Sequence, residues 1–227
     1  MPENQKKILI LSYSFSGQTN GLLRRVASAL EEAGITVIKE RITTVTHLRF
    51  PVSSIPACIS MMVKTFLRQR IKIAPLSTKA KRNYDLILLA GPTWSYNPSG
   101  PVLSLIDRDG PTLFKNKTVI PLISCRGYWR MHWLGLKHLL KRCGAQVPNH
   151  IVFSHPNKEP WSTVGVFLKI AGKNPERHPF LGKYYYHFGH TIDQQDEAAQ
   201  FGKILANALN TGLPLESINF QTPKALP

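Results

Sequence analysis

Five short apolar runs recur along this chain, and segments with a helical apolar pattern lie between most of them. Runs that are apolar on both faces and rich in Val, Ile and Leu are typical of parallel strands covered by helices on either side. No segment is repeated internally, so the pattern predicts a doubly wound α/β sandwich with a five-stranded parallel sheet. The expected strands are 7–13, 35–40, 85–91, 118–124 and 146–153.

Helices are expected where apolar side chains recur at positions i, i+3, i+4 and i+7. Leu136, Leu139, Leu140 and Cys143 follow this spacing, and Gly144 marks the end of that helix. By the same criterion, a helix that ends at Gly34 follows the first strand, and a basic amphipathic helix covers 55–70. A short helix covers about 100–108. The last helix carries Phe201, Ile204, Leu205 and Ala208 on one face.

The 227 residues, 43% of them apolar and 19% charged, can bury a sizeable core as a single domain spanning 1–227. Two segments exceed the minimal sandwich: the helix 55–70 and an insertion at 155–190 that is rich in Trp, Phe and Tyr. The aromatic insertion is expected to pack as a lid, a subunit interface or a partner surface, and a subunit interface would make the protein a homo-oligomer. The tail 212–227 should follow the surface or fray.

Positive charge is concentrated in one part of the chain. Lys and Arg number 29 against 13 Asp and Glu, which gives a formal net charge of +16, and the segment 47–83 holds eight of these cations and no acid. The helix 55–70 in this segment has three interpretations: the solvated back of a core helix, attachment to an anionic membrane surface, or docking to an acidic protein. A nucleic-acid-binding module is disfavoured, because the sequence has no helix-turn-helix, zinc-finger, RRM or KH pattern.

The expected localisation is cytoplasmic, with peripheral attachment to a membrane left open. No apolar run approaches the roughly 20 residues that span a bilayer, and the first residues lack an apolar stretch followed by a cleavage site. Cys58, Cys125 and Cys143 have no CxxC spacing, so reduced thiols are expected rather than a disulfide or a zinc site. His187 and His190 are spaced as i and i+3 without a third ligand, and no metal site is indicated.

The loop SFSGQT (14–19), after the first strand, has the composition of a phosphate-binding loop. In an open parallel sheet, ligands bind at this end of the strands. Hydroxyls at alternate positions, a glycine and free N–H groups at a helix start can hold a phosphate without Lys or Arg. The loop lacks the GK[ST] and GxGxxG patterns, so a phosphate monoester is favoured over a nucleoside triphosphate or a dinucleotide. The alternative is that Ser16 only caps the helix.

Two further loops at the same end carry aromatic side chains. The loop 91–98 after the third strand contains Trp94 and Tyr96, which could stack on a planar heterocycle, although Trp94 could instead close the core beneath the loop. The loop 124–129 offers a glycine, backbone donors and two aromatic rings. All three loops are expected to converge on one crevice.

The first two loops together resemble those of the flavodoxin family. SFSGQT is similar to the family's S/T-x-S/T-G-x-T phosphate loop, and GPTWSYNPSGP is similar to the loop that flanks the isoalloxazine ring. The resemblance covers about 6–154 and the last helix, and it implies a sheet of order 2-1-3-4-5 with one non-covalent FMN. The implied FMN contacts are Ser14, Phe15, Ser16, Gly17, Gln18 and Thr19 around the phosphate, Pro92, Thr93, Trp94, Ser95, Tyr96 and Asn97 on one side of the ring, and Cys125, Arg126, Gly127 and Tyr128 on the other.

Three departures from small flavodoxin carriers bear on function: a basic chain where carriers are acidic, Arg126 in the third loop, and the insertion 155–190. Positive charge near the ring should make the reduction potential less negative, which suits transfer to a small acceptor. The expected function is an FMN-dependent oxidoreductase that takes electrons from NAD(P)H or a redox protein and passes them to an organic acceptor, quinone-like or lipidic. The alternatives are a one-electron carrier and a non-catalytic basic binding protein on a flavodoxin scaffold.

No catalytic residue is assigned from the sequence. Tyr96, Tyr128 and His132 could donate protons, but a stacking or packing role is favoured for each. Cys125 is interpreted as a packed thiol in preference to a redox-active one, because no partner cysteine lies near it in the sequence.

Overall fold

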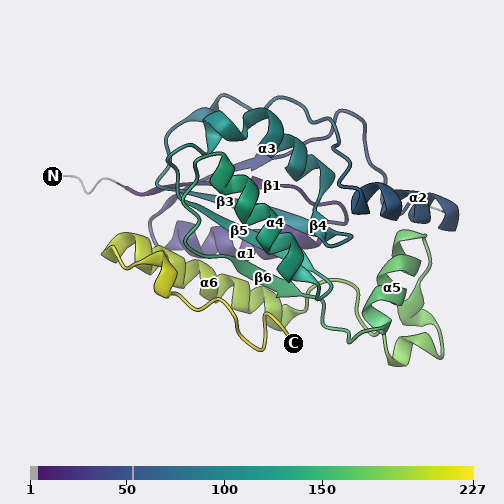
Figure 1. Cartoon of the computed structure of the whole chain (residues 1–227). Helices are drawn as coiled ribbons and strands as arrows, with labels where there is room; N and C mark the ends of the chain where they lie inside the picture. Colours follow the sequence, from purple (N-terminus) through teal and green to yellow (C-terminus); the bar gives the residue numbers. More distant parts are fainter. Residues whose placement is uncertain (1–4, 53) are drawn as a thin grey trace.

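The computed structural model describes residues 5–52 and 54–227, and its centre is a parallel β-sheet (Figure 1). Five strands lie in the order β2-β1-β3-β5-β6, and neighbouring strands along this path are parallel. The α/β fold and the 2-1-3-4-5 order expected from the sequence, which numbers these five strands along the chain, are confirmed. The strands are β1 Lys7–Ser12, β2 Thr36–Arg41, β3 Leu86–Trp94, β5 Val119–Cys125 and β6 Ile151–Ser154.

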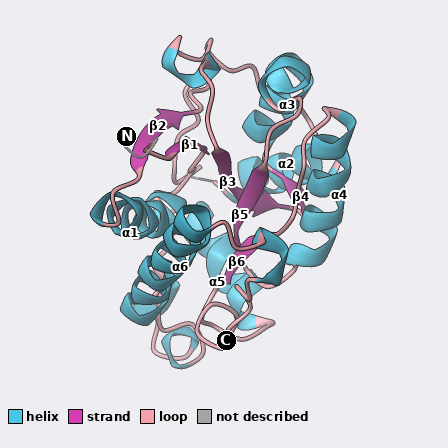
Figure 2. Ribbon diagram, turned by 90° about the vertical axis from the view of Figure 1, so that its left-hand side faces the viewer, coloured by secondary structure: helices cyan, strands magenta, loops and turns pink. Residues whose placement is uncertain are grey.

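Two pairs of helices cover the two faces of the sheet (Figure 2). Side chains alternate along β1, so Ile8 and Ile10 pack in the cluster formed with α1 and α6, whereas Leu9 and Leu11 pack in the cluster formed with α3 and α4. Strands that are apolar on both faces are therefore required here, because both faces are covered. The helices are α1 Gln18–Glu32, α3 Gly100–Leu113, α4 Trp129–Arg142 and α6 Ile192–Thr211.

Several elements differ from those expected. The last strand begins at Ile151, because Pro148 has no N–H for the ladder and Gln146 forms only an isolated bridge. Helix α3 ends at Leu113, beyond the expected end at about residue 108. A short strand that the sequence did not indicate, β4 (Asn97–Pro98), pairs antiparallel with the end of β3.

Two further helices, α2 (Ile55–Phe66) and α5 (Trp161–Ile170), lie beyond the carboxyl ends of the strands and away from the two covering layers (Figure 1). The interpretation of 55–70 as the back of a core helix is wrong, because the apolar stripe of α2 is exposed. The irregular chain between α2 and β3 fills that part of the core with Ile73, Leu76, Ala80 and Tyr84.

The C-terminal tail returns to the sheet. Phe220 and Ala225 are buried in the core cluster with α1 and α6, and the Ser154 N–H donates to the Ala225 carbonyl at 2.9 Å. Of the two expectations for 212–227, the structure shows a tail that packs along the surface. Within the described ranges, no helix has both the length and the apolarity that crossing a membrane requires.

Gly202 allows α1 and α6 to pack closely, and replacing it should destabilise the sandwich. A Cβ atom at this position would lie 2.7 Å from the Val26 carbonyl oxygen and 2.8 Å from the Ala29 Cβ. We expect Gly202→Ala to lower the free energy of unfolding by about 1–3 kcal/mol, measured by urea titration. Gly135→Ala in α4 is the control, because a Cβ there meets nothing within 4 Å and should raise stability by about 0.5–1 kcal/mol. Equal effects of the two changes would contradict the close contact.

Candidate functional site

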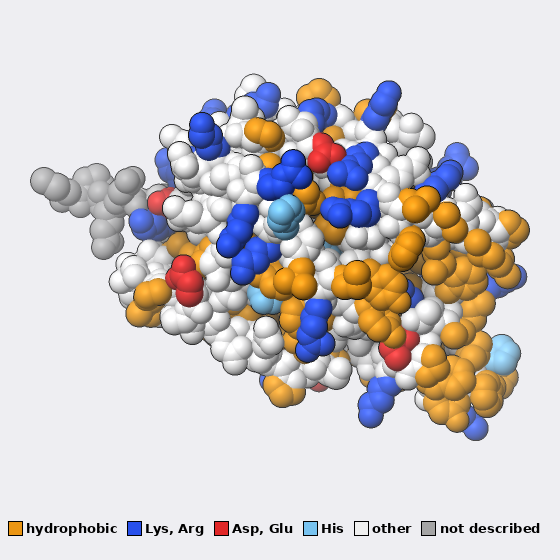
Figure 3. Space-filling view, viewed as in Figure 1, with side chains coloured by type: hydrophobic (Ala, Val, Ile, Leu, Met, Phe, Trp, Pro, Cys, Tyr) orange, Lys and Arg blue, Asp and Glu red, His pale blue; other side chains and the backbone are white. Residues whose placement is uncertain are grey.

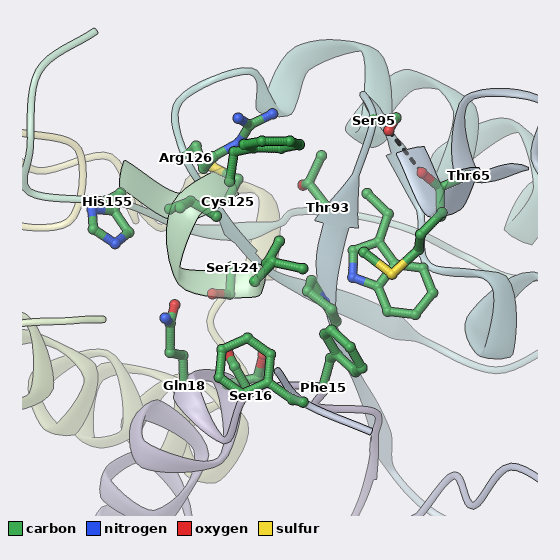
Figure 4. A pocket seen from close by; sticks show the side chains of 18 of the residues that line it. Phe15, Ser16, Gln18, Thr65, Thr93, Ser95, Ser124, Cys125, Arg126 and His155 are labelled. Carbon is green, nitrogen blue, oxygen red and sulfur yellow. Dashed lines mark hydrogen bonds between the residues drawn. The ribbon is translucent and has the colours of Figure 1, made fainter. Parts of the chain in front are cut away.

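The three loops meet in a cavity at the carboxyl ends of β1, β3 and β5 (Figure 4). Ser16 and Gln18 at the start of α1 lie on one side of it, and Thr93, Cys125 and Arg126 lie across from them. The strand order reverses at β1, and open parallel sheets bind ligands beside such a reversal. The predicted contacts on the cavity wall are Ser14, Phe15, Ser16, Gln18, Thr19, Pro92, Thr93, Trp94, Ser95, Cys125 and Arg126.

The first loop offers hydrogen-bond donors to the cavity. Gly17 precedes α1 in a left-handed conformation with a φ of 87°, and no side chain caps the helix. The alternative that Ser16 serves only as a cap is therefore not what the structure shows. The buried Ser14 hydroxyl lines the cavity and has no hydrogen-bond partner among the described residues. A buried hydroxyl without a partner and an uncapped helix start together fit an anionic oxygen.

The second loop is a hairpin between β3 and β4, and its turn residues Ser95 and Tyr96 have φ angles of 43° and 69°. Two left-handed residues in succession make a tight two-residue turn. Tyr96 leaves the cavity and lines a neighbouring groove, where its ring centroid is 5.3 Å from that of Tyr128. Trp94 packs against the core cluster beneath the loop and edge-on against Phe15, and it also lines the cavity. Its stacking on a planar heterocycle stays a prediction.

The third loop places a positive charge on the cavity wall. In the described parts of the chain, no carboxylate forms an ion pair with Arg126. Burial raises the pKa of the adjacent Cys125 thiol to about 12, so this thiol stays protonated at neutral pH. It donates a hydrogen bond to the Phe153 carbonyl at 3.6 Å, which agrees with the packed-thiol interpretation.

Some of the predicted contacts lie outside this cavity. Asn97 donates to the carbonyl oxygens of Thr65 and Phe66, so it ties the hairpin to the end of α2. FMN binding by these residues and by those on the wall stays a prediction. The contacts that do not line the cavity are Gly17, Tyr96, Asn97, Gly127 and Tyr128.

Much of the wall comes from segments that the sequence did not connect with the site. The aromatic content of 155–190 was a signal, and the insertion does close one side of the cavity. Helix α2 gave no signal, because most of its cavity-lining side chains, Cys58, Met61 and Thr65, lie outside its apolar stripe, and only Met62 belongs to both. The residues missed are Phe50, Cys58, Met61, Met62, Thr65, Ser124, His155, Val166, Phe167, Ile170 and Phe188.

Two buried histidines support the cavity wall from behind. His190 Nε2 shares a hydrogen bond with the Ser124 hydroxyl at 2.8 Å, and His190 Nδ1 shares one with Gln194 Oε1 at 3.3 Å. Both ring nitrogens therefore have a partner. His132 shares one with the Thr93 hydroxyl at 2.7 Å. Burial lowers the pKa of His132 to about 3 and that of His190 to about 4, so both are neutral at pH 7. His132 thus positions Thr93, in agreement with a packing role.

The buried histidines should make stability depend on pH. A histidine whose pKa falls on folding binds a proton more readily in the unfolded chain, so stability is highest above about pH 6.5 and falls as the pH drops towards 4. Each such group contributes a slope of about 1.4 kcal/mol per pH unit. We expect His132→Gln to flatten the dependence, measured by urea titration from about pH 7 to about pH 5.

The exposed His47 provides the control for this experiment, since His47→Gln should leave the slope of stability against pH unchanged. Equal slopes for the native chain and for His132→Gln would contradict a neutral, buried imidazole at position 132.

Comparison with known proteins concerns the fold. No protein-family model matches the chain, and no curated protein matches it. Solved structures that resemble it include a flavoprotein of Lactobacillus acidophilus in complex with FMN (18% identity, TM-score 0.50), the flavodiiron protein of Giardia intestinalis (12%, 0.52) and a flavone reductase (12%, 0.50). The alignments cover 64%, 91% and 96% of this chain and 91%, 37% and 66% of those chains, respectively. At such identities the likeness extends to architecture alone, and this chain has the flavodoxin-like fold.

Proposed function

We propose that the chain binds FMN in this cavity and works as an oxidoreductase that passes electrons to an organic acceptor, quinone-like or lipidic. One observation carries the proposal. The same cavity holds a buried Ser14 hydroxyl without a partner among the described residues, an uncapped helix start, aromatic side chains on its wall and, across from the helix start, Arg126, which pairs with no described carboxylate. Together these groups fit a phosphate joined to a planar, electron-accepting ring.

The residues present fit the cofactor at both ends. Ser14, Ser16 and Thr19 offer hydroxyls to the phosphate, and the start of α1 offers its N–H groups. Phe15 and Trp94 offer ring surfaces to a flat heterocycle. When bound, FMN would supply reversible uptake of electrons, while the chain positions it, excludes water and sets the local charge.

The surroundings of the cavity favour a small acceptor over a protein acceptor. Helices α2 and α5 cover the cavity and contribute Met61, Met62 and Phe167 to its wall, which suits an apolar molecule. The cavity and the neighbouring groove share Met62, Ser95 and Arg126, so the groove gives a small acceptor a route to the wall. A small acceptor can follow that route into contact with the cavity wall, whereas a folded protein would have to receive electrons from outside it.

Two variants test FMN binding, and each adds one negative charge: one in the loop before α1 and one on α1 itself. Ser16→Asp places a carboxylate on the cavity wall and should weaken FMN binding at least about tenfold by repelling the phosphate, measured by flavin fluorescence titration. Ser28→Asp on the exposed side of α1 should leave the affinity unchanged. Riboflavin, which lacks the phosphate, should bind both variants equally.

A native chain that neither carries nor takes up flavin would reject the proposed cofactor. If flavin binds, stopped-flow mixing separates the two functions. Reduction by NADH or NADPH followed by rapid reoxidation with a benzoquinone supports the enzyme, whereas reoxidation only by a one-electron protein acceptor supports the carrier.

Arg126 should set the reduction potential of the bound cofactor. A guanidinium on the cavity wall favours the form of the ring that has gained negative charge. We expect Arg126→Gln to lower the two-electron midpoint potential by about 30 mV or more, measured by anaerobic dye titration. Arg130→Gln, at an exposed position on α4, is the matched control and should shift it far less. Equal potentials in the native chain and Arg126→Gln would remove the electrostatic argument.

A further inference from the structure

Helix α2 is apolar on its outer side, where a surface helix is normally polar. Its inner side faces the cavity with Cys58, Met61 and Thr65. Its outer side, by contrast, exposes Phe66 by 63% and Leu67 by 72% of their surfaces. Ile55, Ile59, Met62 and Val63 complete this exposed stripe at helical spacing.

Polar contacts hold α2 in place. The Thr65 and Ser95 hydroxyls share a hydrogen bond of 2.7 Å, and Ser95 Oγ also donates to the Met62 carbonyl at 3.2 Å. Asn97 donates to the carbonyl oxygens of Thr65 and Phe66. The hairpin therefore fixes the orientation of α2 and with it the outward direction of the apolar stripe.

The stripe continues into a larger apolar surface. Met62, Val63, Phe66 and Leu67 form one side of the groove, Tyr96 and Tyr128 form another, and Pro160 at the start of α5 lies on its wall. The insertion adds Phe180 and Tyr184, which pack on Trp161 next to Pro160, and Figure 3 shows apolar groups gathered over this end of the molecule. We call this surface the apolar platform; it comprises Ile55, Ile59, Met62, Val63, Phe66, Leu67, Tyr96, Tyr128, Val164, Phe180 and Tyr184.

The segments that form the platform carry mostly positive charge. The segment 47–83 has no acidic residue, and Lys64 is exposed on α2 itself. Of the two acids in the insertion, Glu176 pairs with Lys169, which leaves Glu159 on the groove wall. The exposed cations of the insertion are Lys158, Lys173, Arg177 and Lys183.

This combination identifies the occupant. An exposed apolar surface of this extent is normally covered by a partner or a membrane. A second copy would bring two cationic surfaces together, which opposes self-association. Protein interfaces are depleted in Lys relative to the rest of the surface, whereas seven of the eleven exposed cations of 47–83 and 155–190 are lysines. Exposed apolar side chains on segments with an excess of cations match an anionic lipid surface.

We propose that the apolar platform docks the protein peripherally onto anionic membranes, with the groove opening towards the lipid. Each contribution is weak alone: apolar side chains enter the boundary between headgroups and acyl chains, and lysines are attracted to anionic headgroups. Docking needs no flavin. Where the proposed function also holds, a lipid-soluble acceptor reaches the cavity from the bilayer through the groove.

Co-sedimentation of the full chain with vesicles tests the proposal. Binding to mixed phosphatidylcholine–phosphatidylglycerol vesicles in low salt should exceed binding to pure phosphatidylcholine at least about tenfold, and should weaken as salt rises. Phe66→Gln with Leu67→Gln should weaken binding at least about tenfold, because both side chains are exposed and available to lipid. Lys64→Gln with Lys158→Gln should weaken it about fivefold per charge removed.

The matched control removes two exposed apolar side chains, one on α6 and one just after its C-terminal end. Ile204→Gln with Leu213→Gln should bind as the native chain does, and circular dichroism should show that all variants fold. Undiminished binding after Phe66→Gln with Leu67→Gln would overturn the proposal, as would absence of binding to anionic vesicles at every salt concentration.

Two other occupants are tested in the same series. A dimer that Phe66→Gln with Leu67→Gln dissociates would assign the platform to a second copy and overturn membrane docking. Binding to polyglutamate as tight as to anionic vesicles would assign it to an acidic protein, with the same consequence. Vesicle binding by a chain that takes up no flavin would support the docking and reject the proposed function, so the two can fail separately.

Discussion

The position of β1 between β2 and β3 is the constraint on which the site depends. After β1 the chain forms β2 on one side of this strand, and it then crosses over to form β3 on the other side. The loops after β1 and β3 consequently diverge at the sheet edge, and the space between them becomes the cavity. Apolar side chains on both faces of β1 suit this interior position, where β2 and β3 lie on either side and helices cover both faces.

Around this edge the chain adds two helices that belong to neither covering layer. Both α2 and α5 turn one side to the cavity, and both belong to segments with exposed apolar side chains on the outside. A helix with apolar or cavity-lining groups on both sides is expected between two partners rather than between a core and water. The basic segment and the aromatic insertion, which look unrelated along the sequence, thus build one end of the molecule together (Figure 1).

Local sequence determined the sheet and the first loop well. Apolar runs identified all five main strands, and the position of SFSGQT between a strand and a helix placed Ser14 and Thr19 on the cavity wall. The hairpin at Ser95 and Tyr96 was missed, because both residues adopt positive φ angles without a glycine to signal them.

The location of helix α2 was left open for a different reason. Periodicity shows which side of a helix is apolar, but it does not show what that side faces. The contacts that decide its location come from Ser95 and Asn97, distant in sequence and polar in character. The role of Met61 and Met62 on the wall follows from these long-range contacts and has no local signature.

The anchoring of α2 has a kinetic consequence. The core clusters hold the sheet and its covering helices, whereas a few hydrogen bonds to one turn and limited burial at Cys58 and Thr65 hold α2. Elements with few buried contacts open locally at a lower free-energy cost than the whole molecule. Local detachment of this helix from the hairpin would then widen the entrance to the cavity while the sheet stays intact.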